Sequence, residues 1–450
     1  MPRKVVVIVV DGMTPAAFER AVEDGSAPAL AYLAAHGEYR QATSVFPSLT
    51  PVCLSSIATG GGPDVHRIPS LVWWHRGERR IVEYGSSFAA LRAAGVSQAL
   101  VDTIFNMNAK HLSRDAVTVY EAVEDAGLVA AAVNITCYRG RHRHLPTLPG
   151  VNRAAYGPKR FFYYSLFESD RTGAPLAVRN RSAGSVDAYA AAVGRWLVTR
   201  DGFDFLAYYL SGYDYASHTH GPERAAEVSL PRTDAAIAAL LEAAGGPDEF
   251  LDRYAVIVHS DHGQTAVSRA ARLEASFRDL PGVVVTASNR AGQVYLLPHA
   301  RVDGADLASR LDGEPAVEVT LRLEDGEAVA RREGEELRFR PYDGRWTTSG
   351  DVSLLDHPNG LARAWSALAN PTAGDLLVSA AEGWELADLG GAHHAGGGSH
   401  GSLVAGDSLV PLLTVGVEAD PRRITDVAPA ALARLGVDVP AAMQAPARVG

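Results

Sequence analysis

The stretch "KVVVIVVDG" at residues 4–12 places six β-branched apolar residues directly before an aspartate and a glycine. A continuous run of this kind is typical of a strand that is buried on both faces of a parallel sheet. The same pattern returns three times, at residues 127–135, 203–210 and 253–260. Segments with helical periodicity accompany these strands, at residues 14–23, 27–36, 186–200 and 223–243, where Pro231 should kink or split the helix. We therefore expect an α/β fold, with a largely parallel central sheet and helices on both faces.

Residues 285–370 have a different pattern, in which short strands alternate with turn signals such as Asp-Gly. This segment predicts a small α+β insertion or cap. The main pattern resumes at residues 374–381, and residues 408–416 form a further strand. We expect a core of residues 1–284 and 371–450, interrupted by an insertion at 285–370.

Composition excludes several classes of function. The 450 residues are 47% hydrophobic and 21% charged, which is ordinary for a globular protein. The net charge is −10 and no long basic run occurs, so binding of a nucleic-acid polymer is disfavoured. Six apolar residues between Lys4 and Asp11 are too few for a signal sequence or a membrane span. We expect a cytoplasmic protein that does not bind a membrane.

Acidic and histidine residues follow the predicted strands. Asp11 ends the first strand, although Asp-Gly is also a routine turn. Asp214 and His218 follow the strand at 203–210, and their spacing puts them on one face of a helix. The alternative for this segment is a polar loop in which the aspartate caps a helix. Because ligands gather at the carboxyl ends of parallel strands, these side chains are candidate metal ligands.

Two further segments supply similar side chains. Asp261 and His262 end the strand at 253–260, where a carboxylate is costly unless it is paired or binds a metal. His400 lies in the Gly-rich loop "GGGSHGS", where a lone histidine more often has no catalytic or metal-binding role. Together the candidates comprise three aspartates and three histidines, which suit Zn²⁺ or Mn²⁺.

The stretch "SVFPSLTPVCLSSIATG" at residues 44–60 places Thr50 before Pro51, at the start of a helix-like apolar run. Thr50 is either a plain N-cap or a nucleophile. The hydroxyl of Thr50 brings the number of candidate metal ligands to seven. Seven ligands are too many for one tetrahedral zinc and divide naturally into two metal sites. The amides of residues 52–54, at the start of this helix, are candidates for stabilising a bound anion.

The order of these motifs is similar to that of the alkaline phosphatase superfamily. Asp-Gly is followed by Pro-Ser-Leu-Thr with Ile-Ala-Thr-Gly, then Asp-x-x-x-His-x-x-Gly-Pro, Ser-Asp-His-Gly and His-Gly. Within the superfamily the chain most resembles the nucleotide pyrophosphatase/phosphodiesterase branch, which includes phosphonoacetate hydrolase. The resemblance implies an alkaline-phosphatase-like core and two divalent metal ions, with zinc first and manganese as the alternative.

The resemblance also assigns roles to residues. It implies that Thr50 is the nucleophile and forms a phospho-threonine intermediate. One metal would be held by Asp11, Thr50, Asp261 and His262. The second metal would be held by Asp214, His218 and His400.

The chain departs from the family pattern after the Thr-Gly of residues 59–60. The family continues as Pro-x-x-His-Gly-Ile to an asparagine that contacts a phosphate oxygen. Here Arg67 replaces the glycine, and the expected asparagine falls near Ser70 and Leu71. Either Ser70 substitutes for the asparagine or another residue is recruited. Trp73 and Trp74 follow, either as a stacking wall for a substrate or as core residues.

Two other segments supply candidate substrate-binding residues. Arg139, Arg141 and Arg143 form a local basic cluster that either holds a substrate anion or is a solvated loop. Near the start of the expected insertion, Asn289 or its neighbour Arg290 is a further candidate.

The leading hypothesis is a dinuclear-metal hydrolase of phosphate esters, most nearly a phosphodiesterase or nucleotide pyrophosphatase. Its substrate would be a small-molecule phosphate ester or phosphonate. The alternatives are phosphonoacetate-type C–P cleavage, a phosphomonoesterase, a phosphomutase and a non-catalytic metal- or phosphate-binding protein. A sulfatase is disfavoured, because its oxidised nucleophile needs Cys-x-Pro-x-Arg, and Cys53 begins "CLSSI" instead. The sequence does not indicate the oligomeric state.

Overall fold

The computed structural model describes residues 4–147, 153–164, 166–169 and 185–443. Its central feature is an eight-stranded sheet, in the order β2-β23-β11-β1-β10-β5-β8-β9. The strands are β1 (Lys4–Val10), β2 (Glu38–Thr43), β5 (Ala130–Val133), β8 (Arg160–Tyr163), β9 (Phe167–Ser169), β10 (Phe205–Leu210), β11 (Tyr254–His259) and β23 (Leu409–Val415).

The central sheet is mixed rather than purely parallel. Its five middle strands, from β11 to β8, run parallel to one another. The strand predicted at 408–416 is β23, and it runs antiparallel to both β11 and β2, while β9 runs antiparallel to β8. The chain leaves β11 at the carboxyl ends of the parallel strands and enters β23 at those same ends. Strand β23 therefore runs antiparallel to β11.

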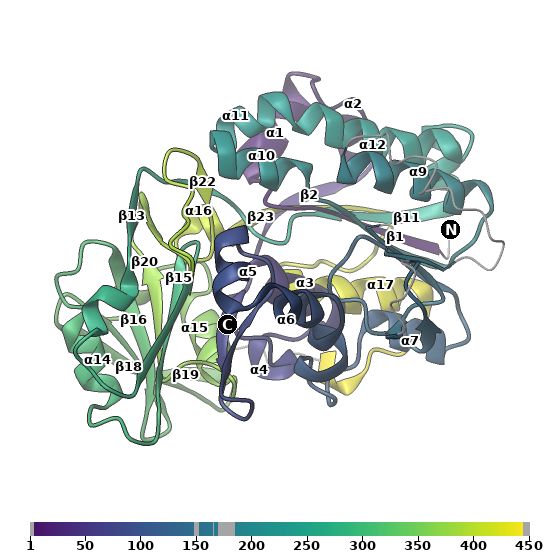
Figure 1. The fold of residues 1–450 in the computed structure, drawn as a ribbon. Coiled ribbons are helices and arrows are strands. Elements are labelled where there is room, and N and C mark those ends of the chain that lie inside the picture. The colour runs from purple at the N-terminus through teal and green to yellow at the C-terminus, as the bar shows by residue number, and fades with distance from the viewer. Residues whose placement is uncertain (1–3, 148–152, 165, 170–184, 444–450) are drawn as a thin grey trace.

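Helices cover both faces of the central sheet, as the α/β prediction requires (Figure 1). One layer contains α1 (Pro15–Glu23), α2 (Pro28–Ala35), α9 (Val186–Thr199), α10 (Gly212–His220), α11 (Pro222–Val228) and α12 (Leu230–Ala243). The other contains α3 (Thr50–Thr59), α7 (Val119–Asp125) and α17 (Val427–Leu435). The predicted long helix at 223–243 is split, because Pro231 lies in the first turn of α12, where its missing N–H costs nothing.

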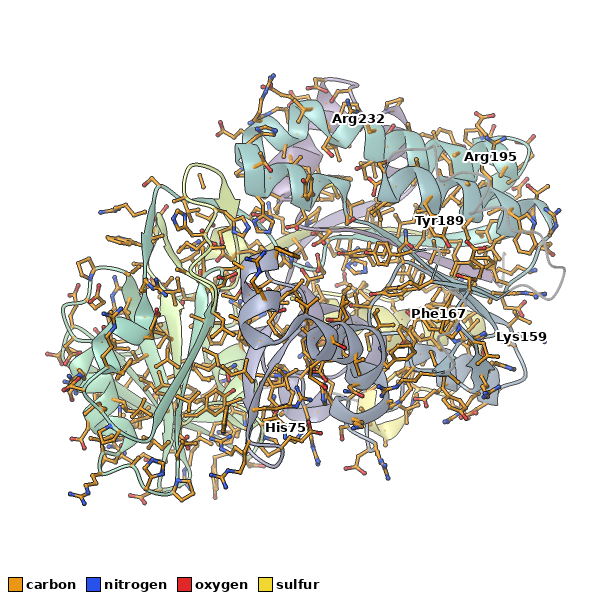
Figure 2. All side chains as sticks on the ribbon, in the orientation of Figure 1. His75, Lys159, Phe167, Tyr189, Arg195 and Arg232 are labelled. Atoms are coloured by element: carbon orange, nitrogen blue, oxygen red, sulfur yellow. The ribbon has the colours of Figure 1, made fainter. Side chains whose placement is uncertain are left out.

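The run in β1 is apolar throughout because both of its faces are buried. Val6, Ile8 and Val10 face the layer of α1 and α12, whereas the alternate residues face α3 and α17. Figure 2 shows the same division farther along, where Tyr189 of α9 and Phe167 of β9 belong to the two opposite apolar clusters.

Between α3 and α7 the chain forms short elements on the side of the second layer. These are α4 (Pro63–His66), the hairpin β3 (Val72–His75) and β4 (Arg80–Glu83), α5 (Phe88–Ala94), α6 (Val96–Val101) and a π-helical turn at Asp102–His111. In the described part of the chain, no single helix has the length and apolarity that a membrane span needs. Only the pair Phe88–Ala94 and Val96–His111, bent by 105°, meets the length and composition criteria jointly.

A second sheet of seven strands lies beside the first (Figure 1) and is antiparallel throughout. Two helices, α14 (Gly304–Arg310) and α15 (Gly360–Leu368), contribute to its apolar clusters. In spatial order its strands are β14 (Val283–Ser288), β15 (Ala291–Leu296), β20 (Leu376–Ala380), β16 (Val317–Glu324), β17 (Glu327–Arg332), β18 (Glu335–Tyr342) and β19 (Arg345–Gly350).

This sheet corrects the expected boundary of the insertion. The strand predicted at 374–381 does not return to the central sheet, because β20 pairs with β15 and β16. The second sheet therefore spans residues 283–380 and is larger than the segment 285–370 that the sequence suggested. An apolar strand buried on both faces looks the same in either sheet, so the pattern could not distinguish them. The outer ends of the expected core, residues 1–3 and 444–450, lie outside the described residues.

Candidate metal centre and active site

The carboxyl ends of three neighbouring strands bring the predicted ligands together. Asp11 follows β1, Asp261 follows β11, and Asp214 lies in the first turn of α10, directly after β10. These strands are adjacent in the order β11-β1-β10, and the backbone N–H of Asp11 donates to the carbonyl of Leu210 at 2.9 Å. His400 arrives from the loop that follows β22 (Gly398–Ser399).

Five of the six candidate aspartate and histidine ligands form one cluster with two overlapping groups, which leaves His218 outside both. In the first, the ligand atoms of Asp11, Asp261 and His262 all lie within 4.8 Å of one another. In the second, the same holds for Asp214, His262 and His400. His262 Nε2 lies 3.2 Å from Asp11 Oδ1, and the rings of His262 and His400 stack at 3.6 Å between centroids. His262 is therefore the centre of the cluster.

Helix α10 presents Asp214 and His218 on one face, as their spacing predicted. His218 Nε2 lies 3.4 Å from Asp214 Oδ2. The start of this helix is held by buried Asp187, which accepts hydrogen bonds from the N–H groups of Ser211 and Gly212 at 3.0 and 3.2 Å. A Cβ on Gly212 would lie 2.5 Å from an oxygen of Asp187, so a glycine is needed at this turn.

Thr50 is the first residue of α3, and its hydroxyl points into the cluster. Leu49 occupies the N-cap position, so the structure does not support the plain N-cap interpretation of Thr50. Thr50 Oγ1 lies 3.1 Å from His262 Nε2. The N–H groups of Val52 and Cys53 donate to the carbonyl of Leu49, both at 2.9 Å. Those two amides are therefore used within the helix, contrary to the expectation that they face an anion.

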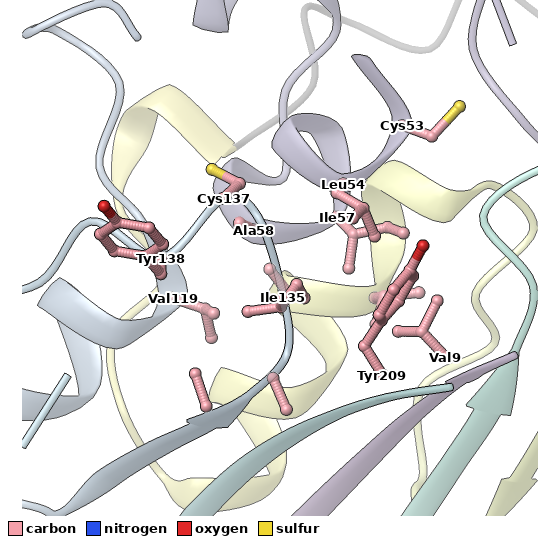
Figure 3. Packing of buried hydrophobic residues seen from close by; sticks show 14 of the residues in the cluster. Val9, Cys53, Leu54, Ile57, Ala58, Val119, Ile135, Cys137, Tyr138 and Tyr209 are labelled. Atoms are coloured by element: carbon pink, nitrogen blue, oxygen red, sulfur yellow. The ribbon is translucent and has the colours of Figure 1, made fainter. Parts of the chain in front are cut away.

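The packing of α3 fixes the position of Thr50. Figure 3 shows Leu54, Ile57 and Ala58 of α3 beside Val9 of β1, in the apolar cluster on that side of the sheet. Tyr209 of β10 lies in the same region and donates its hydroxyl to Asp11. The hydroxyl of Thr50 and the carboxylate of Asp11 are thus held by the same packed surface.

All three histidines are oriented in the same way. The Nδ1 atoms of His218, His262 and His400 donate to the carbonyls of Gly398, Gly263 and Ser48 at 2.9, 2.9 and 2.7 Å. This leaves each Nε2 to face the cluster. Metal-binding histidines in proteins are commonly fixed by a hydrogen bond from the other ring nitrogen.

The carboxylates lack the donors that their burial requires. Asp11 and Asp261 are 3% and 0% exposed, yet Asp11 Oδ1 and Asp261 Oδ2 accept no hydrogen bond from the described residues. Burial and the neighbouring carboxylate of Asp214 raise the pKa of Asp11, and burial and Asp11 raise the pKa of Asp261. His262 faces both carboxylates, but the remaining buried negative charge is costly, so this donor set fits a further cation.

Burial and the neighbouring charges also shift the pKa values of the histidines. Burial opposes the charge on His262, but Asp261, Asp11 and Asp214 outweigh it and raise the pKa of His262 to about 10. Burial and the neighbouring His262 lower the pKa of His400. Burial also opposes the charge on His218, but Asp214 outweighs it and raises the pKa of His218, so the acidic groups favour the protonated forms of both His262 and His218.

Of the candidate substrate-binding residues, the structure brings Asn289 to the cluster. Its amide Nδ2 lies 2.9 Å from His400 Nε2. Ser70 is buried, but none of the contacts found in the described residues joins it to a candidate metal ligand. Trp73 is a core residue at 2% exposure, and half-buried Trp74 packs against the same apolar cluster. The structure thus favours core packing of these tryptophans over a stacking wall.

The arginine cluster lies elsewhere. Arg139 is paired with Glu121, and Arg141 is paired with Glu121 and Asp125, all on α7. Arg143 is exposed on β6 (His142–His144). Arg139 and Arg141 line a hollow of about 550 Å³ that is not lined by any of the seven candidate residues. The cluster is therefore not placed to hold a substrate at the metal centre.

Two residues that support the site from behind, Gln264 and Asp407, were not predicted from the sequence, and Arg290 was named only as an alternative to Asn289. Gln264 donates its amide to Asp214, and its place two residues after His262 was the available signal. Arg290 and Asp407 form a fully buried ion pair at 2.8 Å, and the N–H of Arg290 donates to the carbonyl of His400 at 2.9 Å. No sequence signal joins Arg290 to Asp407, because they lie 117 positions apart.

A cluster of carboxylates and imidazoles beside a hydroxyl at a helix start, at the carboxyl ends of the strands of an α/β sheet, suits metal-assisted hydrolysis. Residues 5–403 match the family described as type I phosphodiesterase / nucleotide pyrophosphatase, and the chain belongs to this family. No curated protein sequence matches the chain significantly.

Solved structures share the fold. Phosphonoacetate hydrolase from Sinorhizobium meliloti 1021, in complex with phosphonoformate, aligns with a TM-score of 0.65 at 19% identity, over 97% of this chain and 96% of that one. Murine ectonucleotide pyrophosphatase / phosphodiesterase 5 aligns with a TM-score of 0.62 at 14% identity, over the same shares of the two chains. An inactive form of the murine protein has been solved in complex with AMP. The alkaline-phosphatase-like fold class predicted from the sequence is confirmed.

Proposed function

We propose that this protein is a dinuclear-metal hydrolase of phosphate esters, of the phosphodiesterase or nucleotide pyrophosphatase kind, with Thr50 as its nucleophile. The observation that carries the proposal is the position of Thr50 Oγ1, 3.1 Å from His262 Nε2. His262 is shared by the two groups of candidate ligands. A hydroxyl beside two such groups suits the attack on phosphorus that this family performs.

We assign the metal ligands as the family pattern suggests, although the second observed group contains His262 rather than His218. Asp11, Thr50, Asp261 and His262 would hold one ion, and Asp214, His218 and His400 the other. Zinc fits the mixed oxygen and nitrogen donors, with manganese as the alternative. Bound ions would lower the pKa of the Thr50 hydroxyl and offset the negative charge of the phosphoryl oxygens.

The residues of the chain set up the reaction. The packing of α3 holds Thr50 Oγ1 in place, so little motion is needed before attack. Oγ1 forms a bond to phosphorus while the bond from phosphorus to the leaving alcohol breaks, which gives a phospho-threonine. Water then cleaves the new ester and restores the hydroxyl. The hydrogen bond from Tyr209 keeps Asp11 oriented throughout.

Phosphonoacetate-type C–P cleavage is the second candidate, and the fold shared with phosphonoacetate hydrolase favours it. Such a substrate carries a carboxylate that needs its own cationic partner. Arg139, Arg141 and Arg143 would be the obvious partners, but Arg139 and Arg141 are paired with α7 and line a separate hollow. A phosphate ester needs no such partner, so we rank ester hydrolysis first. Phosphomonoesterase, phosphomutase and binding-protein alternatives rank lower, and the cytoplasmic location stays a prediction.

The test is a substrate panel with metal-reconstituted protein. We expect zinc-loaded protein to hydrolyse bis-p-nitrophenyl phosphate faster than p-nitrophenyl phosphate, and to lose that activity after chelation. Faster release of phosphate from phosphonoacetate would favour C–P cleavage instead. Less than one equivalent of bound metal after reconstitution, with no turnover, would favour a binding protein.

A further inference from the structure

We propose that the side-chain amide of Asn289 donates a hydrogen bond to a non-bridging oxygen of the phosphoryl group. It would do so in place of the asparagine that the chain lacks after its Thr-Gly motif. This inference rests on the proposed function, because it needs a phosphoryl group at the metal centre. It names a substrate-binding residue that comes from the second sheet, far in sequence from the motif.

The backbone holds Asn289 firmly at the centre. Asn289 occupies the turn between β14 and β15, with φ of +56°. Its carbonyl accepts a hydrogen bond from the N–H of Leu386 at 2.7 Å, and the next N–H, that of Arg290, donates to the carbonyl of His400 at 2.9 Å. The turn is therefore fixed directly against the loop that carries a candidate metal ligand.

The side chain of Asn289 is buried, with 5% of its surface exposed. Its Oδ1 accepts a hydrogen bond from the hydroxyl of Ser288 at 3.0 Å, which directs the amide NH₂ toward the cluster. There Nδ2 donates to His400 Nε2 at 2.9 Å. His400 Nδ1 donates to the carbonyl of Ser48, so Nε2 carries the lone pair that a cation would use.

Metal binding would leave the amide in need of an acceptor. Once the lone pair of His400 Nε2 is used by a cation, the N–H of Asn289 loses its partner but remains at the centre. A buried donor without an acceptor is costly, and an anionic oxygen is a strong acceptor. A phosphoryl oxygen bound beside the cation supplies one.

Ser70 is less well placed for this role. The carbonyl of the preceding residue, Pro69, accepts a hydrogen bond from Gln293 of β15 at 2.7 Å. This contact ties the segment to the second sheet. Within the described residues no contact of Ser70 reaches Thr50 or His400, whereas the amide of Asn289 touches His400 directly.

The experiment measures metal content and binding of inorganic phosphate by zinc-loaded protein. Asn289→Gly removes the amide and tolerates the positive φ. Asn359→Gly is the matched control, since Asn359 also has a positive φ of 50° but is exposed and bonds Thr43. We expect N289G to keep the metal content of the unmodified protein and to bind phosphate at least tenfold more weakly, with N359G unchanged in both.

Asn289→Asp replaces the amide donor with a negatively charged carboxylate. Its carboxylate should repel phosphate and weaken binding further than the glycine does. Unchanged phosphate binding in N289G or N289D, while the unmodified protein hydrolyses phosphate esters, would overturn this inference alone. Loss of metal in N289G would overturn it in favour of a role in supporting His400. Failure of the unmodified protein to bind phosphate or to hydrolyse any ester would overturn the proposed function as well.

Discussion

At the scale of single residues, His262 is the most constrained group in the candidate site. It is fully buried, its ring stacks on His400, and its Nε2 faces Thr50, Asp11 and Asp261. In the metal-free protein the acidic neighbours keep it protonated, with a pKa raised to about 10. A histidine must be neutral to bind a metal, so the proton on His262 competes with the metal.

We therefore expect metal binding to release a proton and to strengthen with pH. Below the pKa of about 10, each binding event that uses His262 must displace its proton. Affinity should then rise by at least about tenfold per pH unit between about pH 6 and 8, because Asp214 also raises the pKa of His218, a second proposed ligand. Titration calorimetry in buffers of different ionisation enthalpy measures the proton release. A pH-independent affinity with no proton released would contradict this view of His262.

The sequence predicted the members of the cluster but not all of their surroundings. Asp11, Asp261 and His262 could be picked out because a polar group at the end of a buried strand needs a reason to be there. Asn289 could be named but not placed, because its contact with His400 depends on how two sheets meet. Trp73 could not be assigned, since an aromatic residue suits a core and a binding wall equally well.

At the scale of elements, the sequence predicted the structure correctly where a residue pattern is compatible with a single structure. Pro231 marked the break between α11 and α12, because proline removes a helix hydrogen bond wherever it falls. The run at 376–380 has no such mark, since β20 is buried on both faces in an antiparallel sheet. The sequence therefore predicted a strand there but not its sheet. Gly263 lies in the segment after β11 that carries Asp261 and His262.

We expect Gly263→Ala to disturb the metal centre. A Cβ on Gly263 would lie 2.0 Å from the carbonyl oxygen of Gly406 and 2.9 Å from that of Leu409, and neither backbone can move freely. Overpacking of this kind should reduce the free energy of unfolding by about 1–3 kcal/mol. It should also lower the metal content by moving His262.

Gly202→Ala is the control for this change, because its Cβ would lie 3.6 Å from its nearest neighbour. Urea unfolding and elemental analysis of both variants provide the measurements. A G263A protein as stable and as rich in metal as the G202A protein would show that the close approach at residue 263 is unimportant.

At the scale of the whole molecule, the site joins two sheets. Asp11, Asp261 and His262 directly follow strands of the central sheet and Asp214 lies on α10 after β10, whereas Asn289 belongs to the turn of the second sheet. The buried ion pair of Arg290 and Asp407 ties that turn to the loop after His400. This ion pair could not be predicted from the sequence, because Arg290 and Asp407 are each ordinary charged residues in their own segments.

The central claim is that Thr50 becomes covalently attached to the substrate. The direct measurement is mass spectrometry of zinc-loaded protein quenched in acid after mixing with bis-p-nitrophenyl phosphate. We predict a p-nitrophenylphosphoryl group on the peptide that contains Thr50. Thr50→Ala should lack it and turn over at least about a thousandfold more slowly, with its fold unchanged. Full turnover by T50A, or a modified peptide that excludes Thr50, would contradict the account.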